Sequence, residues 1–362
     1  KVLAISVGLL CVLLAYNHNK SSTYEIGGSI YGTYWKLVST DYISDSIKQS
    51  IVVELDRIDL IASNYKIQSE LSILNKAPAN TKIKISKDLY NLLSLAEDLN
   101  KVSEGAYDVT LGSMVINGGF GPEATITSYD LKANKRFVIS EDLYLEKYNQ
   151  FLFDLSSIAK GYAVDSIHDL LIASNRPNFL FDIGGELIVS GSKHGSPWII
   201  GIQDPIEFTN QAITNIATDS FLAVATSGEY RNYSIDDNGI ASSHTFDPFT
   251  SKSIKNKVLS VTVSSKKSAM VADAWATLLN VTGSEIGLAL AEKHQISVLY
   301  IINENNEVVV LDNLSTGNKL NLNSLTEKKK LKLIVEDLRN NGKISSHFKD
   351  IDTVFHMAAD PE

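Results

Sequence analysis

The feature that most constrains this fold is a series of short β-branched segments separated by glycine-rich turns. Between residues 179 and 265 the segments read FLFDIGGELIVSG, WIIGIQDP, FLAVATSGEY and VLSVTVSS. Helical patterns occur before and after the series, but strands and helices do not alternate as a parallel βαβ sheet requires. The chain therefore predicts an α+β fold with mostly antiparallel sheets and packed helices.

Three segments place apolar residues at the spacing of an amphipathic helix. They span residues 42–65, 86–105 and 268–283. Ser86 and Ser268 stand where an N-cap is expected, because a serine hydroxyl can accept a hydrogen bond from a free N–H of the first turn. Gly105 and Gly283 are expected to end their helices, since glycine adopts the left-handed backbone of a C-terminal cap.

The first 20 residues resemble a targeting segment. Residues 2–16 are apolar and uncharged, and Lys1 precedes them, which suits a signal-peptide core and is short for a membrane-spanning helix. Leucines precede Cys11 where a lipoprotein signal would have small residues, so we expect an export signal or an uncleaved membrane anchor. A buried strand is the alternative. Either signal predicts an extracytoplasmic location, in the periplasm or on the outer face of the membrane.

Charge and cysteine content exclude several classes of function. The 362 residues carry a net charge of -9 and no basic stripe offsets it, so no nucleic-acid partner is expected. Cys11 is the single cysteine, which excludes an intramolecular disulfide framework and a cysteine-ligated zinc site.

The stretch FDLSSIAKGYAVDSIHDLL, residues 153–171, begins like a strand and continues like a helix. Lys160 falls in the first helical turn, where a cation opposes the helix dipole. A bound anion would compensate, because free N–H groups also point there; otherwise the side chain bends into water. Asp154 either contacts such a ligand or caps the helix.

The helix at 268–283 carries Asp273 and Thr277 four residues apart, so both side chains lie on one face. A carboxylate and a hydroxyl are hard oxygen ligands that suit Mg²⁺. The alternative is structural, an aspartate that stabilises the helix dipole beside a threonine bonded to its own backbone.

Two further segments allow a functional and a structural interpretation. His244 lies in the polar segment SSHTFDPFTSK, and an ordinary histidine pKa near 6.5 suits a general base at neutral pH. A solvent-exposed loop histidine is the alternative. The two glycines of DIGGE, residues 182–186, indicate either close approach of the backbone to a ligand or a hairpin turn.

Eight segments occur in the order expected of one protein family. They read SNYKIQSELSILN, GAYDVTLGSM, GGFGP, DLSSIAKGYAVD, DIGGELIVSG, ATSGEYRNY, SHTFDPFTSK and SVTVSSKKSAMVADAWAT. Over roughly residues 27–305 the sequence closely resembles the ApbE family of FAD:protein FMN transferases. The resemblance implies an exported enzyme that cleaves the FAD pyrophosphate with Mg²⁺. It would attach FMN through a phosphoester to a threonine or serine of an acceptor protein and release AMP.

The resemblance also implies a class of acceptor protein. Typical acceptors are subunits of membrane redox pumps and extracytoplasmic electron carriers, and an N-terminal anchor would associate the enzyme with the membrane. Two other functions remain open at this point. One is an FAD pyrophosphatase that gives FMN and AMP, and the other is a flavin-binding protein without catalysis.

Matched motif to motif, the resemblance assigns the FAD site to residues of several segments. They are Tyr65, Gly118, Gly119, Phe120, Asp154, Lys160 and Phe246. Tyr65 would pack on the flavin or the adenine, and Phe246 would supply a wall or a backbone contact. Gly118 stands where many relatives have tryptophan, so one wall of the flavin pocket is expected to be thinner.

The resemblance assigns catalysis and metal binding to four residues. Ser157, through its carbonyl, would hold Mg²⁺ together with Asp273 and Thr277. His244 would take the proton from the incoming threonine.

The C-terminal segment shows a different pattern. VVVLDNLSTGN at 308–318 and DIDTVFHMAADPE at 350–362 resemble NAD-dependent nucleotide-sugar epimerases, in which the residue matching Asp312 binds the ribose of NAD. No G-x-G-x-x-G loop precedes the first segment and no Tyr-x-x-x-Lys follows, so we expect a partial Rossmann-like fragment without epimerase activity.

These patterns predict three parts of the chain. Residues 1–20 form the signal peptide or anchor, residues 21–306 the transferase domain, and residues 307–362 the incomplete epimerase-like fragment. Residues 307–312 are expected to supply a final strand to the transferase sheet.

Overall fold

A computed structural model describes most of residues 22–302 and two short strands beyond them. The described residues are 22–122, 136–205, 212–228, 233–235, 241–243, 245–254, 257–302, 308–312 and 331–335. In these ranges no helix is both long enough and apolar enough to cross a membrane. The predicted targeting segment, residues 1–20, lies outside them.

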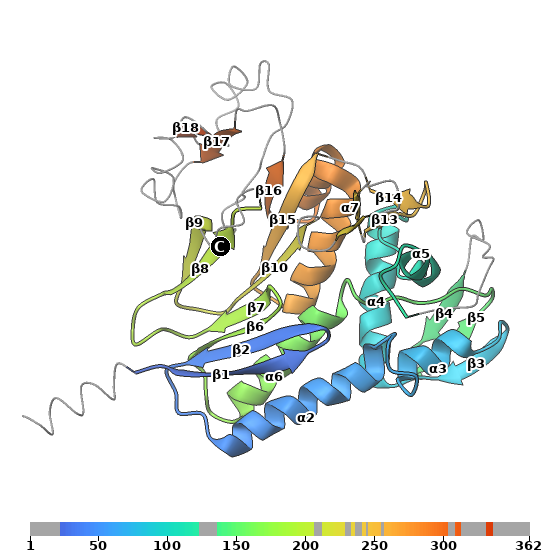
Figure 1. The fold of residues 1–362 in the computed structure, drawn as a ribbon, viewed down its shortest axis with the longest axis horizontal. Coiled ribbons are helices and arrows are strands. Elements are labelled where there is room, and N and C mark those ends of the chain that lie inside the picture. The colour runs from blue at the N-terminus through green and yellow to red at the C-terminus, as the bar shows by residue number, and fades with distance from the viewer. Residues whose placement is uncertain are drawn as a thin grey trace, which may run out of the picture.

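A seven-stranded sheet forms the centre of the molecule (Figure 1). Its order is β1-β2-β6-β7-β10-β15-β16, and every neighbouring pair is antiparallel. The strands are β1 (Tyr24–Ile30), β2 (Thr33–Ser39), β6 (Phe179–Ile183), β7 (Glu186–Ser190), β10 (Leu222–Gly228), β15 (Val258–Ser265) and β16 (Ser297–Ile302). The predicted α+β class with antiparallel strands is confirmed.

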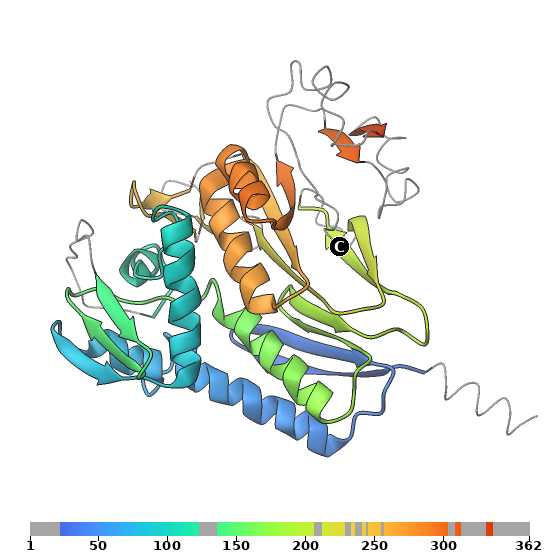
Figure 2. The same ribbon diagram turned by 180° about the vertical axis from the view of Figure 1, so that it is seen from behind.

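Helices cover one face of this sheet, and a hairpin packs on the other (Figures 1 and 2). The helices in contact with the sheet are α6 (Ala159–Ala173) and α7 (Ala269–Lys293), which also pack on each other. The helix α2 (Asp45–Ala62) packs against α6. The hairpin consists of β8 (Trp198–Gln203) and β9 (Ala212–Thr218).

Alternation along β6 explains these two layers. Phe179, Phe181 and Ile183 are fully buried in the core beneath the helices, whereas Leu180 contacts the cluster formed with the hairpin. Successive side chains of a strand point to opposite faces, so one strand serves both cores. Each fully buried phenylalanine contributes about 1.5–3 kcal/mol relative to an exposed one.

A small lobe lies beside the helical layer. It contains α3 (Glu70–Lys76), β3 (Thr81–Lys84), α4 (Lys87–Val102), α5 (Gly112–Asn117), β4 (Phe137–Ser140) and β5 (Tyr144–Lys147). The three strands form an antiparallel sheet in the order β3-β5-β4. Because α4 contacts both α2 and α7, the small lobe is fixed to the helices that cover the main sheet.

Three short strand pairs complete the described structure. They are β11 (Tyr233–Ile235) with β12 (Ala241–Ser243), β13 (Phe246–Asp247) with β14 (Lys252–Ser253), and β17 (Val308–Asp312) with β18 (Leu331–Val335). The last pair is parallel. The prediction that residues 307–312 add a final strand to the main sheet is wrong, because β17 pairs with β18 in a separate sheet and β16 is the edge strand.

The predicted helices and their N-caps are confirmed. Ser86 and Ser268 each accept a hydrogen bond from the N–H of the third residue of α4 and α7. Gly105 follows α4 with a φ of 96°. Gly283 has a φ of 72° and interrupts the helical backbone as expected, but helical residues resume and α7 continues to Lys293.

Candidate functional site

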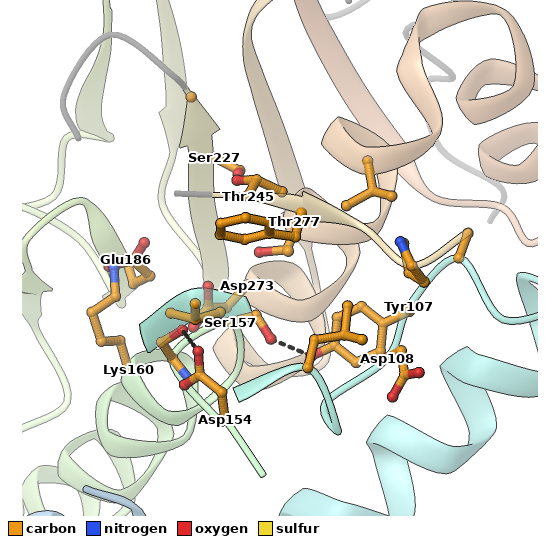
Figure 3. A pocket seen from close by; sticks show the side chains of 18 of the residues that line it. Tyr107, Asp108, Asp154, Ser157, Lys160, Glu186, Ser227, Thr245, Asp273 and Thr277 are labelled. Atoms are coloured by element: carbon orange, nitrogen blue, oxygen red, sulfur yellow. Dashed lines mark hydrogen bonds and ion pairs between the residues drawn. The ribbon is translucent and has the colours of Figure 1, made fainter. Parts of the chain in front are cut away.

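A cavity of about 240 Å³ lies where the N-terminal ends of α6 and α7 meet the small lobe (Figure 3). Its wall is built from the loop at 106–111, Val115 of α5, the corner at 154–160, the first residue of β7, the end of β10, the β13 turn, and one face of α7 from Asp273 to Val281. Hydroxyl, carboxylate and ammonium groups from these segments, far apart in sequence, point toward one another in Figure 3.

The corner that leads into α6 presents an acid to this cavity. Asp154 Oδ1 accepts hydrogen bonds from the Ser156 N–H at 2.9 Å and the Asn64 amide at 3.1 Å. Its Oδ2 accepts from the Ser156 hydroxyl at 3.0 Å. This is an Asx turn and not a helix cap, because the N-cap position is Ile158 and no side chain caps α6. The carboxylate of Asp154 is therefore held in one orientation before the helix begins.

Lys160 meets a second acid across the cavity wall. Its Nζ lies 2.5 Å from Oε2 of Glu186, which is 3% exposed. Glu186 is the first residue of β7, directly after a turn in which Gly184 and Gly185 have φ values of 62° and 114°. The hairpin interpretation of DIGGE is confirmed, and the tight turn also brings this carboxylate to the cavity. Lys160 thus neutralises a buried charge and does not simply bend into water.

Asp273 connects α7 to the first turn of α6. Its Oδ2 accepts a hydrogen bond from the Gly161 N–H at 2.9 Å, and its side chain is buried. The close approach requires glycine, because a Cβ at residue 161 would lie 2.4 Å from the Ala269 carbonyl oxygen. Burial, followed by the nearby Glu186 carboxylate, raises the pKa of Asp273 to about 7.

Three residues of the cavity form a set of hard oxygen ligands. Asp273 offers a carboxylate, Thr277 a hydroxyl one turn further along α7, and Ser157 a backbone carbonyl. The Ser157 hydroxyl is engaged with the hydroxyl of Tyr107 at 2.8 Å, which is compatible with a role for the carbonyl. This donor set fits Mg²⁺. The raised pKa of Asp273 agrees with the fit, because a cation would offset the charge of the buried carboxylates.

Across the described ranges, no group of three or more His, Cys, Asp or Glu side chains is placed to hold a metal ion.

The structure brings six of the predicted site residues to this one cavity. They are Asp154, Ser157, Lys160, Phe246, Asp273 and Thr277. Tyr65 and the turn at 118–120 are not part of its lining. The Tyr65 hydroxyl donates to the Phe120 carbonyl oxygen at 3.0 Å, while 68% of the residue is exposed. The roles of Tyr65, Gly118, Gly119 and Phe120 toward FAD stay predictions.

Gly118 nevertheless shapes the cavity through Phe246. A Cβ at residue 118 would lie 2.5 Å from Cζ of Phe246, so the aromatic ring occupies the space that a side chain there would need. The expected thinner wall of the flavin pocket at Gly118 stays a prediction.

The predicted base, His244, lies outside the described residues. The next two residues, Thr245 and Phe246, line the cavity. Its assignment as a base stays a prediction.

Sequence reasoning did not assign several polar residues of the cavity. Tyr107 is buried, and burial raises the pKa of its hydroxyl. Thr226 lies on β10, with its Oγ1 2.8 Å from Oγ1 of Thr262, and Ser227 follows it. All of them, with Glu186, fall inside segments that carry the family resemblance, so the segments pointed to the region without identifying each side chain.

Comparisons with known proteins agree on one family. A profile of the ApbE family matches residues 31–301. The FAD:protein FMN transferases of Vibrio cholerae and Haemophilus influenzae are 36% and 33% identical to the chain, over 80% and 83% of its length and 91% and 94% of theirs.

Solved structures give the same result. The flavin transferase ApbE from Vibrio cholerae matches with a TM-score of 0.69 at 32% identity, over 78% of this chain and 94% of that one. The flavinyl transferase ApbE of Pseudomonas stutzeri, in its apo form, matches with a TM-score of 0.67 at 29% identity, over 78% of this chain and 92% of that one. The chain described here belongs to the ApbE family.

Proposed function

We propose that this protein is an FAD:protein FMN transferase. The acceptor hydroxyl oxygen would bond to the FMN phosphorus while the pyrophosphate P–O bond breaks, AMP would leave, and the hydroxyl proton would pass to a base. The observation that carries this proposal is the convergence of Asp154, Lys160, Asp273 and Thr277 on one cavity. It is supported by relatives whose printed function is this transfer.

The chain's own residues would bind and orient the dinucleotide. Lys160 would supply a positive charge for the pyrophosphate beside the first turn of α6, where the N-cap residue Ile158 makes no side-chain hydrogen bond. Asp154 accepts hydrogen bonds and would contact a hydroxyl or N–H of FAD. Phe246 would form an apolar wall of the site.

Mg²⁺ is proposed as the cofactor, held by Asp273, Thr277 and the Ser157 carbonyl. When bound, it would neutralise charge on the phosphoryl oxygens and stabilise AMP as leaving group. His244 is proposed as the base that receives the proton of the acceptor hydroxyl, since it immediately precedes two residues of the cavity wall.

Partner and location are proposed from the same resemblance. The acceptor would be a subunit of a membrane redox pump or a related extracytoplasmic flavoprotein, modified on threonine or serine. An N-terminal signal or anchor in residues 1–20 would place the enzyme outside the cytoplasm. No activity is proposed for residues 307–362, which lie beyond the family match at residues 31–301.

One incubation separates transfer from the alternatives. The protein is mixed with FAD, Mg²⁺ and a purified redox-pump subunit that carries a flavinylation threonine. Transfer predicts a subunit heavier by covalently bound FMN, together with an equal amount of AMP. Free FMN with AMP would instead indicate a pyrophosphatase, and unchanged FAD would indicate binding without catalysis. The same subunit with that threonine changed to alanine is the control and should stay unmodified.

A further inference from the structure

Asn75, at the end of α3 in the small lobe, is paired with the strand-like segment that enters the site. Its Nδ2 donates to the Phe153 carbonyl oxygen at 3.0 Å, and its Oδ1 accepts from the Phe153 N–H at 2.7 Å. One side chain thus makes both hydrogen bonds that a neighbouring strand would make. The residue it fixes directly precedes Asp154 in the chain.

Asn64 continues this contact to the cavity. Its Oδ1 accepts a second hydrogen bond from Asn75 Nδ2 at 3.1 Å, and its Nδ2 donates to Asp154 Oδ1 at 3.1 Å. An asparagine amide presents a donor and an acceptor at opposite atoms, so Asn64 can join a donor on one side to a carboxylate on the other. The two asparagines form a continuous chain of hydrogen bonds that ends on an acid of the cavity wall.

Lys147, the last residue of β5, fixes the other end of this chain. The side chain is fully buried, and its Nζ lies 3.1–3.4 Å from four backbone carbonyl oxygens. These belong to Leu74, Asn75, Ala77 and Phe151. One ammonium therefore joins the C-terminal end of α3, where a cation is favoured by the helix dipole, to the segment that leads to Phe153.

We infer that Asn64 and Asn75 are positioning residues that hold the Asp154 carboxylate toward the ligand, with Lys147 anchoring them to the small lobe. The identity of the ligand as FAD rests on the proposed function. The Asn64 amide orients the carboxylate through a hydrogen bond and adds no charge of its own. A hydrogen bond to a charged group is also the kind whose loss has a large effect.

A double-mutant cycle tests this inference. The dissociation constant for FAD is measured in the presence of Mg²⁺ for the wild-type chain, Asn64→Ala, Asp154→Ala and the double variant. We expect Asn64→Ala to weaken FAD binding by roughly tenfold, as loss of a hydrogen bond to a charged group predicts. In the Asp154→Ala background, Asn64→Ala should have little further effect, because the group it positions is gone. Asn64→Ala should change KM for FAD more than it changes kcat.

The exposed Asn215 on β9, outside the cavity lining, provides the matched control, and Asn215→Ala should leave FAD binding unchanged. The positioning role would be overturned if Asn64→Ala weakened FAD binding equally in the wild-type and Asp154→Ala backgrounds, or in neither, while the wild-type chain still bound FAD. If the wild-type chain itself binds no FAD, the proposed function fails instead. Asn75→Ala should give the same pattern, and the Asn64 cycle decides the question if that variant does not fold.

Discussion

Each of the two central helices places an aspartate against the first turn of the other, and the two contacts differ. Asp165 of α6 accepts hydrogen bonds from the Ser268 hydroxyl at 2.6 Å and from the N–H groups of Ala269 and Met270 at 2.7 and 2.9 Å. Asp273 of α7 accepts one from the Gly161 N–H and lines the cavity. The same residue type, in reciprocal positions on neighbouring helices, accepts three hydrogen bonds in one case and faces the cavity in the other.

The difference supports the proposal that Asp273 binds Mg²⁺, whereas Asp165 stabilises the start of α7. Asp273 is buried and Asp165 is half-buried, each near a positive helix terminus, and desolvation raises the pKa of both carboxylates. Asp165 receives three donors at the start of α7, which use the free N–H groups of that helix. Asp273 has Glu186 as a neighbouring charge, so an additional cation at the cavity would relieve both acids. Exchange of each acid for its amide should therefore have different consequences, a loss of activity for Asp273 and a loss of stability for Asp165.

The largest effect is expected from Asp273→Asn. The amide keeps the acceptor for the Gly161 N–H but removes the negative charge for Mg²⁺, so release of AMP from FAD should fall about a thousandfold. AMP is measured by chromatography at saturating Mg²⁺. Asp165→Asn is the matched control and should retain activity within a few-fold. Equal activity losses in the two variants would remove the distinction between the acids.

Lys160→Gln should have the next largest effect, on FAD binding. Loss of the charge that is proposed to contact the pyrophosphate should raise KM for FAD by about ten- to a hundredfold. The variant also leaves the buried Glu186 carboxylate without this lysine, so its thermal stability should fall. Adding Glu186→Gln should restore stability but not FAD affinity. Recovery of both would assign Lys160 a structural role like that of Asp165.

Asp165→Asn should instead reduce stability. Replacing a carboxylate that holds three donors at the start of α7 should lower the free energy of unfolding by about 1–3 kcal/mol. Urea denaturation followed by far-UV circular dichroism measures the loss. A variant as stable as the wild type would show that the Ser268 cap alone is sufficient for α7.

The sequence alone could not predict which groups the two acids contact. The periodic apolar positions and serine caps predicted α2, α4 and α7, and the glycine-separated segments predicted the strands, because those features depend on neighbours in the chain. The partners of the acids are distant in the sequence and could not be predicted in this way. Lys160 pairs with Glu186, 26 residues away, and the Gly161 N–H pairs with Asp273, 112 residues away. The motifs indicated which segments form the site. The structure alone showed that Asp273 bonds to α6 and that Phe246 fills the space beside Gly118.

The smallest expected effect is a dependence of stability on pH that comes from Asp273. Its pKa is raised to about 7 in the folded chain, above the value near 4 of an unfolded aspartate. Folding is therefore favoured by this group at low pH, and its contribution is lost as the pH rises from about 4 through 7.

In EDTA, the Tm of the wild type relative to Asp273→Asn should fall by a few °C between pH 5.5 and pH 8. Excess Mg²⁺ should remove or reverse this trend, because a cation favours the charged carboxylate. Differential scanning fluorimetry of both proteins, with and without Mg²⁺, measures it. A Tm difference that stays constant with pH in EDTA would mean that Asp273, like an exposed acid, is already charged without a cation.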